Sequence, residues 1–197
     1  MPKKSTAEPP TPTTARRGRP PSVAVERAVF DEILRQVQTQ PPTGITRTTV
    51  ADGASVSRQT LYNRWPTVAD IVLDALLERA ERTIGIAETS LTSYLTDLAA
   101  AAGGWARPGL RAVATFAQSD PVFAGRFRTD FLPARHGALR RAVGAEVPDG
   151  DLADRISELI AGSMWYRILV IDAALDQEWI DAMTSLAADA TGMPSRS

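Results

Sequence analysis

Side chains of the kinds that read DNA bases are concentrated between Ser57 and Trp65. In the major groove, arginine can bond O6 and N7 of guanine with its fork, and asparagine or glutamine can do the same on adenine, while hydroxyl groups bind phosphates. The chemistry that we expect of this segment is therefore contact with double-stranded DNA. The residues that would make it are Ser57, Arg58, Gln59, Thr60, Tyr62, Asn63 and Arg64.

The spacing of the apolar residues in this segment predicts a short helix. Only Leu61 and Trp65, four residues apart, are expected to be buried, so the polar groups would point outward. The alternative interpretation is an ordinary solvated helix face. Such a face usually carries Glu and Lys four residues apart, and this segment contains neither. The pattern therefore favours a helix whose polar side faces a ligand.

A second short helix is predicted immediately before the first. Thr46 is a good N-cap because its hydroxyl can accept a bond from a free backbone N–H, and Ser55 interrupts the pattern about two turns later. Ser57 is again a good N-cap for the following helix. The apolar positions of the first helix are Val50, Ala51 and Ala54. Two short helices joined by a tight turn form a helix-turn-helix.

This motif resembles the N-terminal helix-turn-helix of the TetR family of bacterial transcriptional regulators. The resemblance implies that Arg58, Gln59 and Asn63 face base edges. It also implies contacts with the DNA backbone from Thr46, Thr48, Thr60, Tyr62 and Arg64. The matching positions are Val50-Ala51, Ala54, Val56-Ser57, Thr60-Leu61-Tyr62 and Trp65-Pro66-Thr67.

Two positions depart from the family pattern. Ser55 stands where a glycine is common, so the turn must either avoid a positive φ or accept modest strain, unless Gly53 absorbs it. Val68 stands where a lysine is common, and valine cannot neutralise a phosphate. We therefore expect one backbone contact of the family to be missing.

The segment before the first helix contains a second basic motif. Arg16-Arg17-Gly18-Arg19-Pro20-Pro21 resembles the core of an AT-hook, in which guanidinium groups enter a narrow A·T-rich minor groove. We expect Arg16, Arg17 and Arg19 to make such contacts, although basic residues at this position can also serve solubility alone. The composition of residues 1–21 predicts a disordered basic arm.

The elements around the motif are predicted to be helical. A helix from Ser22 to the prolines at 41 and 42 should cover the back of the two short helices, giving a DNA-binding unit over residues 22–66. Thr67 should cap a linking helix that fades near Gly85. Further helices are expected over residues 89–102, 109–118, 121–143, 152–175 and 177–190, with a kink or break at Pro133.

The absence of any useful alternating run predicts an all-α protein. The N-terminal three-helix unit would be followed by a helical ligand-binding and dimerisation domain over residues 67–191, with a flexible tail at 192–197. The last two predicted helices have wide apolar faces. They could complete the core of one chain or pair with their copies in a homodimer, and the family resemblance favours the homodimer.

Aromatic residues of the second domain allow two interpretations. Phe123, Phe127 and Phe131 recur every four residues, which is typical of an ordinary core. The competing interpretation is that they line a cavity for a small-molecule effector, and nothing in the sequence decides between the two. The residues predicted for such a cavity are Trp105, Phe116, Phe123, Phe127, Met164 and Tyr166, with Trp165 as a further candidate.

Charge and composition limit the other functions. Residues 1–70 carry ten Lys+Arg against six Asp+Glu (+4), and residues 71–197 carry twelve against seventeen (−5), which suits a molecule that meets phosphate with one end. The sequence has no cysteine and one histidine, His136, so we expect no metal or other cofactor. Asp130 and His136 would lie on opposite faces of a helix, which argues against a catalytic pair.

These patterns predict a transcriptional regulator without enzymatic activity, and the family resemblance implies a ligand-responsive repressor that binds a palindromic operator as a homodimer. The alternatives are an architectural protein of the minor groove and an all-α enzyme built on the aromatic cavity. The sequence has no apolar run near 20 residues and no hydrophobic leader segment. We therefore expect no membrane partner and a cytoplasmic location, on the nucleoid when DNA is bound.

Overall fold

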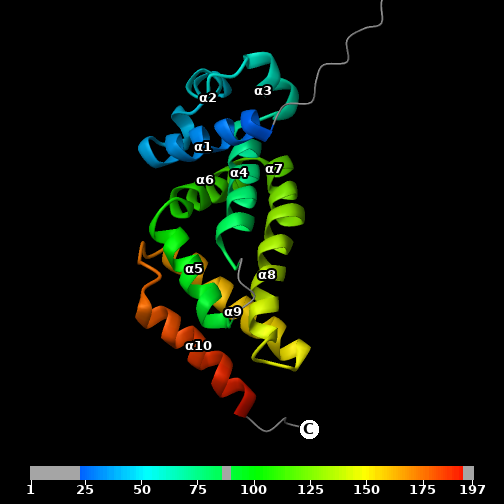
Figure 1. Ribbon diagram of the computed structural model, residues 1–197, viewed down its shortest axis with the longest axis vertical. Helices are drawn as coiled ribbons and strands as arrows, with labels where there is room; N and C mark the ends of the chain where they lie inside the picture. The colour runs from blue at the N-terminus through cyan, green and yellow to red at the C-terminus, as the bar shows by residue number, and fades with distance from the viewer. Residues whose placement is uncertain (1–22, 86–89, 193–197) are drawn as a thin grey trace, which may run out of the picture.

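The computed structural model describes residues 23–85 and 90–192. All of its regular elements in those ranges are helices, as the all-α prediction required (Figure 1). None of these helices is long and apolar enough to cross a membrane. Ser22 and the arm residues Arg16, Arg17 and Arg19 lie outside the described residues, so the cap and the minor-groove contacts stay predictions.

The N-terminal unit consists of α1 (Val23–Thr39), a 3-10 turn (Pro42–Gly44), α2 (Arg47–Gly53) and α3 (Arg58–Arg64). In its core, the ring of Phe30 from α1 packs edge to face on the ring of Trp65, with centroids 5.7 Å apart. Val50 of α2 and Leu61 of α3 are fully buried beside them. This apolar packing stabilises α2 and α3, because helices of seven residues are not stable alone.

Helix α4 (Val68–Thr83) connects this unit to the rest of the protein. The Thr67 side chain accepts from Asp70 N–H while the Asp70 carboxylate accepts from Thr67 N–H, which confirms the predicted cap. Helix α4 packs against both α1 and α6. Figure 1 shows α4 running from the upper layer, formed by α1, α2 and α3, down into the lower helices.

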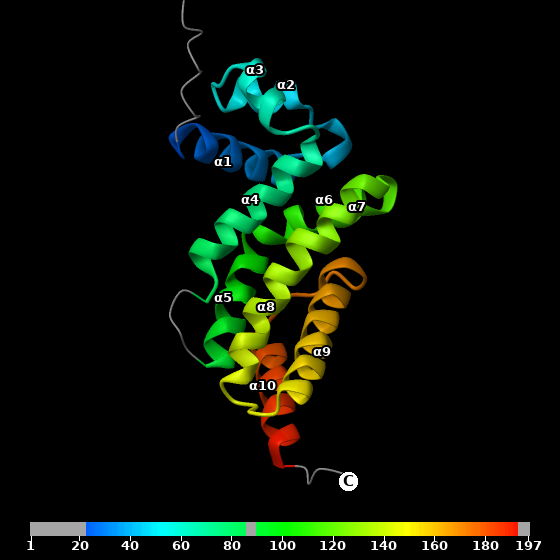
Figure 2. The same ribbon diagram turned by 90° about the vertical axis from the view of Figure 1, so that its right-hand side faces the viewer.

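The lower domain is a helical bundle. Helices α8 and α10 both pack against α5 and α9. Helix α10 lies at the end of the molecule far from α2 and α3 (Figure 1, Figure 2). Its elements are α5 (Leu91–Gly103), α6 (Ala106–Ser119), α7 (Pro121–Arg126), a π-helical turn (Phe127–Phe131), α8 (Leu132–Gly144), α9 (Gly150–Leu169) and α10 (Gln177–Gly192).

The predicted break at Pro133 is present as the π-helical turn before it. The N–H of Leu132 bonds to the carbonyl of Phe127, five residues earlier, instead of four. Proline has no N–H, and its ring would clash with the carbonyl four residues before it in a regular helix. The wider turn removes that conflict and places Pro133 in the first turn of α8, where it is tolerated.

Two helix boundaries differ from the prediction by three residues or more. Helix α6 begins at Ala106 rather than at 109, because Pro108 falls in its first turn and costs no hydrogen bond there. Helix α9 ends at Leu169 rather than at 175. Arginine side chains bind carbonyls at that end: Arg111 donates to Ile168 O at 2.9 and 3.0 Å, and Arg107 donates to Ala173 O at 2.6 Å. These bonds stabilise a loop in place of further helix.

Candidate DNA-reading surface and effector cavity

Helix α3 has the orientation that the sequence predicts. The Ser57 side chain accepts from Thr60 N–H at 3.1 Å, which fixes the start of the helix. Leu61 and Trp65 are buried, with 0% and 2% of their surfaces exposed. The side chains of Arg58, Gln59 and Asn63 consequently lie on the exposed side. Their contact with bases stays a prediction, but the geometry that it needs is present.

The polar groups of α3 are ordered by contacts with one another. The Arg58 guanidinium donates to both carboxylate oxygens of Asp52 in α2, at 3.0 and 3.3 Å. Nε2 of Gln59 donates to Oδ1 of Asn63 at 2.7 Å. Within the described residues this leaves the Gln59 carbonyl oxygen and the Asn63 amide nitrogen free of side-chain partners. Together they offer an acceptor and a donor, which is the pair that an adenine edge requires.

Arg47, the first residue of α2, belongs to the same surface and was not predicted. Its guanidinium lies over the Tyr62 ring, 3.9 Å from the centroid, and donates to Trp65 O at 3.2 Å. The Tyr62 hydroxyl lies 3.2 Å from Oγ1 of Thr48. A basic residue directly after the N-cap Thr46 was the signal in the sequence. These contacts join α2 to α3 and place a positive charge beside the expected phosphate-binding groups.

Two further predicted residues have partners inside the protein. Arg64 forms an ion pair with Glu26 of α1 and lies 5.0 Å from the Trp65 ring, so it is directed toward α1. The Thr46 hydroxyl accepts from Thr49 N–H at 3.1 Å and forms the predicted cap of α2. A phosphate contact by Arg64 would have to replace its bond to Glu26.

The turn between α2 and α3 is made by Ser55 itself. Its φ is +55°, so the serine adopts the left-handed conformation that glycine would adopt without strain. The expectation that Gly53 absorbs the turn is wrong, because Gly53 is the last residue of α2. A Cβ at Gly53 would overlap the carboxylate of Glu32. The glycine therefore serves the close approach of α1 to α2.

Glu32 forms the hydrogen bonds at the close contact between α1 and α2. Its carboxylate accepts from Arg35 at 2.7 and 2.8 Å and from Gln36 at 2.6 Å. Gln36 in turn donates to Thr49 O and accepts from the Thr49 hydroxyl, which ties α1 to α2. The hydrogen bond from Arg35, followed by that from Gln36, lowers the pKa of Glu32 against the opposing effect of burial.

A chain of polar contacts connects the end of α3 to the lower domain. The Trp65 indole N–H donates to Oδ2 of Asp74 in α4 at 2.9 Å, and the other oxygen of Asp74 pairs with Arg126 at the end of α7. Arg126 also pairs with Asp70 at 2.7 Å and with Asp130 at 3.3 Å. Burial opposes the charged form, but the hydrogen bonds and charges of Asp70 and Asp74 raise the pKa of Arg126 above its ordinary value.

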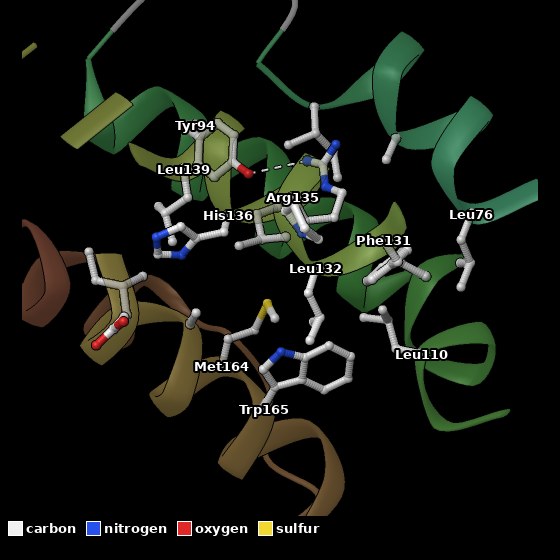
Figure 3. Close-up of a pocket in the computed structure, with 18 of the residues that line it drawn as sticks. Leu76, Tyr94, Leu110, Phe131, Leu132, Arg135, His136, Leu139, Met164 and Trp165 are labelled. Carbon is white, nitrogen blue, oxygen red and sulfur yellow. Dashed lines mark hydrogen bonds between the residues drawn. The ribbon is translucent and has the colours of Figure 1, made fainter. Parts of the chain in front are cut away.

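A cavity of about 510 Å³ lies between α4, α5, α6, α8 and α9. Figure 3 shows apolar side chains from all sides, with Arg135 and His136 entering from α8. Its wall contains Leu76, Ala80, Ile84, Tyr94, Leu98, Trp105, Ala106, Leu110, Phe131, Leu132, Pro133, Arg135, His136, Leu139, Glu158, Ile160, Ala161, Met164 and Trp165. The interior is thus mainly hydrocarbon and aromatic.

The structure brings only Trp105 and Met164 of the six predicted cavity residues into this wall, together with the further candidate Trp165. Phe116 and Phe123 pack edge to face on each other, with centroids 6.1 Å apart, outside the cavity lining. Phe127 lies behind the wall, where it stacks on Phe131 at 5.3 Å. Tyr166 points away from the cavity, with 54% of its surface exposed.

The two residues weighed as a catalytic pair do not meet. Asp130 pairs with Arg126 and accepts from the Thr129 hydroxyl at 2.9 Å, whereas His136 faces the cavity. Across residues 23–85 and 90–192, no group of three or more His, Asp or Glu side chains is placed to hold a metal ion.

Helix α9 leaves an apolar stripe exposed. Leu159, Tyr166 and Leu169 are 59%, 54% and 40% exposed, and they recur at spacings of seven and three residues. Gly162 lies between them, and a Cβ placed there would meet nothing within 4 Å. Large exposed side chains in a row around a glycine form a surface that another helix can approach closely.

Comparison with known proteins identifies the same architecture. The family model described as "Tetracyclin repressor-like, C-terminal domain" matches residues 84–187, more than half of the chain. An uncharacterized HTH-type transcriptional regulator, YdeS of Bacillus subtilis (strain 168), is 20% identical over 176 residues, covering 84% of this chain and 89% of the relative.

A solved structure agrees at the level of the fold. The TetR family repressor AlkX from Dietzia sp. strain DQ12-45-1b, implicated in biodegradation of n-alkanes, superimposes with a TM-score of 0.55 at 17% identity. The match covers 91% of this chain and 99% of that one. The helix-turn-helix, the helical domain below it and these matches lead to one conclusion: the chain belongs to the TetR family of DNA-binding transcriptional regulators.

Proposed function

We propose that this regulator is a ligand-responsive repressor that binds a palindromic operator as a homodimer. The observation that carries the proposal is the exposed face of α3, on which Arg58, Gln59 and Asn63 lie above the buried Leu61 and Trp65. In this proposal α3 enters the major groove and these three side chains contact base edges. Ser57, Thr60 and Tyr62 of the same motif, with Thr46 and Thr48, hold phosphates, and Arg47 adds a charge.

The stripe on α9 supports the homodimer. Burying Leu159, Tyr166 and Leu169 against their copies would remove the largest exposed apolar side chains of this helix from water. Gly162 at the centre would allow the two α9 helices to cross at short distance. A twofold dimer would present two α3 helices, and their spacing on DNA would then be about one helical turn, roughly 34–36 Å.

The contacts from the cavity to α3 support the response to a ligand. Phe131 of the cavity wall ends the π-helical turn that begins one residue after Arg126. A ligand that moves this turn also moves Arg126, and through Asp74 it moves α4 and Trp65. The repressor would release DNA only because the ligand binds more tightly to the conformer with misplaced α3 helices.

Competition binding tests the proposed function. Genomic fragments retained by the purified protein are challenged with bulk DNA, and a regulator is expected to prefer its operator by at least about a thousandfold. An architectural protein of the minor groove would show no such preference. Equal retention of operator and bulk DNA would contradict the proposal, as would a preference that survives simultaneous replacement of Arg58, Gln59 and Asn63 by alanine.

A further inference from the structure

The cavity has polar groups of unequal burial. Of its polar side chains, Tyr94 is 6% exposed and Arg135 and His136 are half-buried, whereas Glu158 is exposed. The negative charge in the lining is therefore in contact with water and screened by it. The positive charge of Arg135 lies deeper, next to hydrocarbon, where its field is stronger.

Arg135 and Tyr94 form one donor pair at the wall. A guanidinium nitrogen of Arg135 donates to the Tyr94 hydroxyl oxygen at 3.2 Å, shown as the dashed line in Figure 3. Burial raises the pKa of Tyr94, so the phenol keeps its proton at neutral pH. Because its oxygen accepts from the guanidinium, its O–H is left to donate to another group. Both residues thus offer hydrogen-bond donors to an acceptor in the cavity.

The described part of the chain supplies no carboxylate to Arg135. A second hollow, of about 580 Å³, shares Tyr94 and Arg135 with the cavity and also contains Glu81 and Arg141. Neither Glu81 nor Glu158 lies within ion-pair distance of Arg135. A half-buried guanidinium beside apolar side chains is stabilised strongly by a counter-ion.

We infer that the cavity takes an apolar molecule with a single carboxylate, and that Arg135 and Tyr94 bind this carboxylate. The inference rests on the proposed function, since the molecule would be the effector of the regulator. The carboxylate accepts from the Arg135 guanidinium and the Tyr94 O–H, and His136 supplies a further N–H donor. The hydrocarbon part lies between Phe131, Met164 and Trp165. An alkylamine should bind weakly, because its positive charge would lie beside that of Arg135.

The experiment compares three probes of equal chain length: decanoate, 1-decanol and decylamine. Binding to the full-length protein is measured by calorimetry and by tryptophan fluorescence, to which Trp105 and Trp165 in the wall contribute. Decanoate is expected to bind at least about tenfold more tightly than decanol, because hydrogen bonds to a charged group are roughly twice as strong as neutral ones. Decylamine is expected to bind most weakly. Shortening decanoate by one CH₂ should weaken binding about fourfold.

Variants separate the carboxylate from the apolar contact. Arg135→Gln is expected to remove the tenfold preference for decanoate over decanol while decanol binds as before. Tyr94→Phe keeps the ring and loses only the O–H, and should reduce the preference about threefold to tenfold. The Tyr94→Phe variant also tests the inference if Arg135→Gln fails to fold. Arg128→Gln changes an exposed arginine of the π-helical turn and should leave the preference unchanged.

The inference is overturned if decanol or decylamine binds as tightly as decanoate, or if none of the three binds. It is equally overturned if both Arg135→Gln and Tyr94→Phe keep the full preference. Operator binding is measured on the same samples without probe. If the native protein shows no preference for operator over bulk DNA, the proposed function itself is contradicted. If it binds operator but does not prefer decanoate among the three probes, only the assignment of the carboxylate is contradicted.

Discussion

The indole N–H of Trp65 donates a 2.9 Å hydrogen bond to Oδ2 of Asp74, which joins the residue that ends α3 to the middle of α4. The same carboxylate pairs with Arg126, the last residue of α7 and the one directly before the π-helical turn. The side chains of Asp74 and Arg126 therefore connect the end of α3 with the turn that contributes Phe131 to the cavity wall. Coupling between the two sites requires a physical connection of this kind or a shift of the whole ensemble.

Replacement of Arg126 by glutamine should weaken the response to ligand. Allosteric coupling of about 1–3 kcal/mol corresponds to a 5–150-fold change in operator affinity, and we expect the variant to keep less than about threefold. The measurement is the operator Kd with and without saturating ligand. Arg128→Gln, two residues along the chain, is the matched control because that side chain is exposed. An unchanged response in Arg126→Gln would exclude this connection.

Replacement of Gln59 or Asn63 by alanine should relax base preference at one position of each half-site. A good bidentate base contact discriminates by about 1–3 kcal/mol, so binding to the preferred and substituted operators should become nearly equal at that position. Arg47→Gln provides the contrast. It should weaken binding to all DNA sequences alike and reduce the slope of log affinity against log salt concentration by about one. Affinities for a panel of single-base variants distinguish the two outcomes. Unaltered preference in both alanine variants refutes the assignment.

Gly53→Ala and Ser55→Gly should have opposite effects on stability. The added Cβ at Gly53 would displace Glu32 and its bonds to Arg35 and Gln36, at a cost of about 1–3 kcal/mol. Ser55→Gly relieves the left-handed strain at φ +55°, with a gain of up to about 1 kcal/mol. Urea unfolding followed by circular dichroism measures both. Equal effects from the two variants would contradict the roles given to these positions.

Acid should destabilise the N-terminal unit through Glu32. The pKa of Glu32 is lowered in the folded protein, so its contribution is complete above the unfolded pKa of about 4.3 and is lost as pH falls through the lower folded value. Glu32→Gln removes this contribution, so its unfolding free energy should depend less on pH in that acid range. Glu81→Gln, at an exposed position, is the control. Parallel acid dependence in the native protein and Glu32→Gln would disprove the assignment.

Leu159→Glu should convert the proposed homodimer to a monomer. The substitution places a charge in the middle of the α9 stripe, where two copies would bring like charges together out of water. Val122→Glu is the control, because Val122 is 85% exposed and lies on α7, away from this stripe. Sedimentation velocity at several protein concentrations gives the mass of each. A monomeric native protein, or a dimeric Leu159→Glu, would place the interface elsewhere.

Local sequence signals explain why the N-terminal unit of α1, α2 and α3 could be predicted. Thr46, Ser57 and Thr67 cap the helices that come directly after them, as expected, because a cap depends on residues within three positions. The outward side of α3 was predictable from the spacing of two buried residues, Leu61 and Trp65. Arg47 was missed because its contact with Tyr62 joins two different helices.

The cavity could not be predicted in the same way. The π-helical turn adds one residue to the turn and so rotates α8 relative to α7 by about 100°. The regular spacing of Phe123, Phe127 and Phe131 does not show which of them reaches the cavity: Phe123 meets Phe116 and Phe127 stacks on Phe131, and of the three only Phe131 lines the wall. The bond between Tyr94 and Arg135 likewise joins residues far apart in the chain.

The most direct test of the account is selection of DNA fragments from a random pool by the purified full-length protein. Two α3 helices of a homodimer should recover inverted half-sites whose centres lie about 10–10.5 base pairs apart, or a multiple of that spacing. The same selection with Gln59→Ala should lose one preferred base in each half-site. Recovery of single half-sites, of half-sites at random spacing, or of no shared sequence would contradict the claim that α3 reads DNA twice in each dimer.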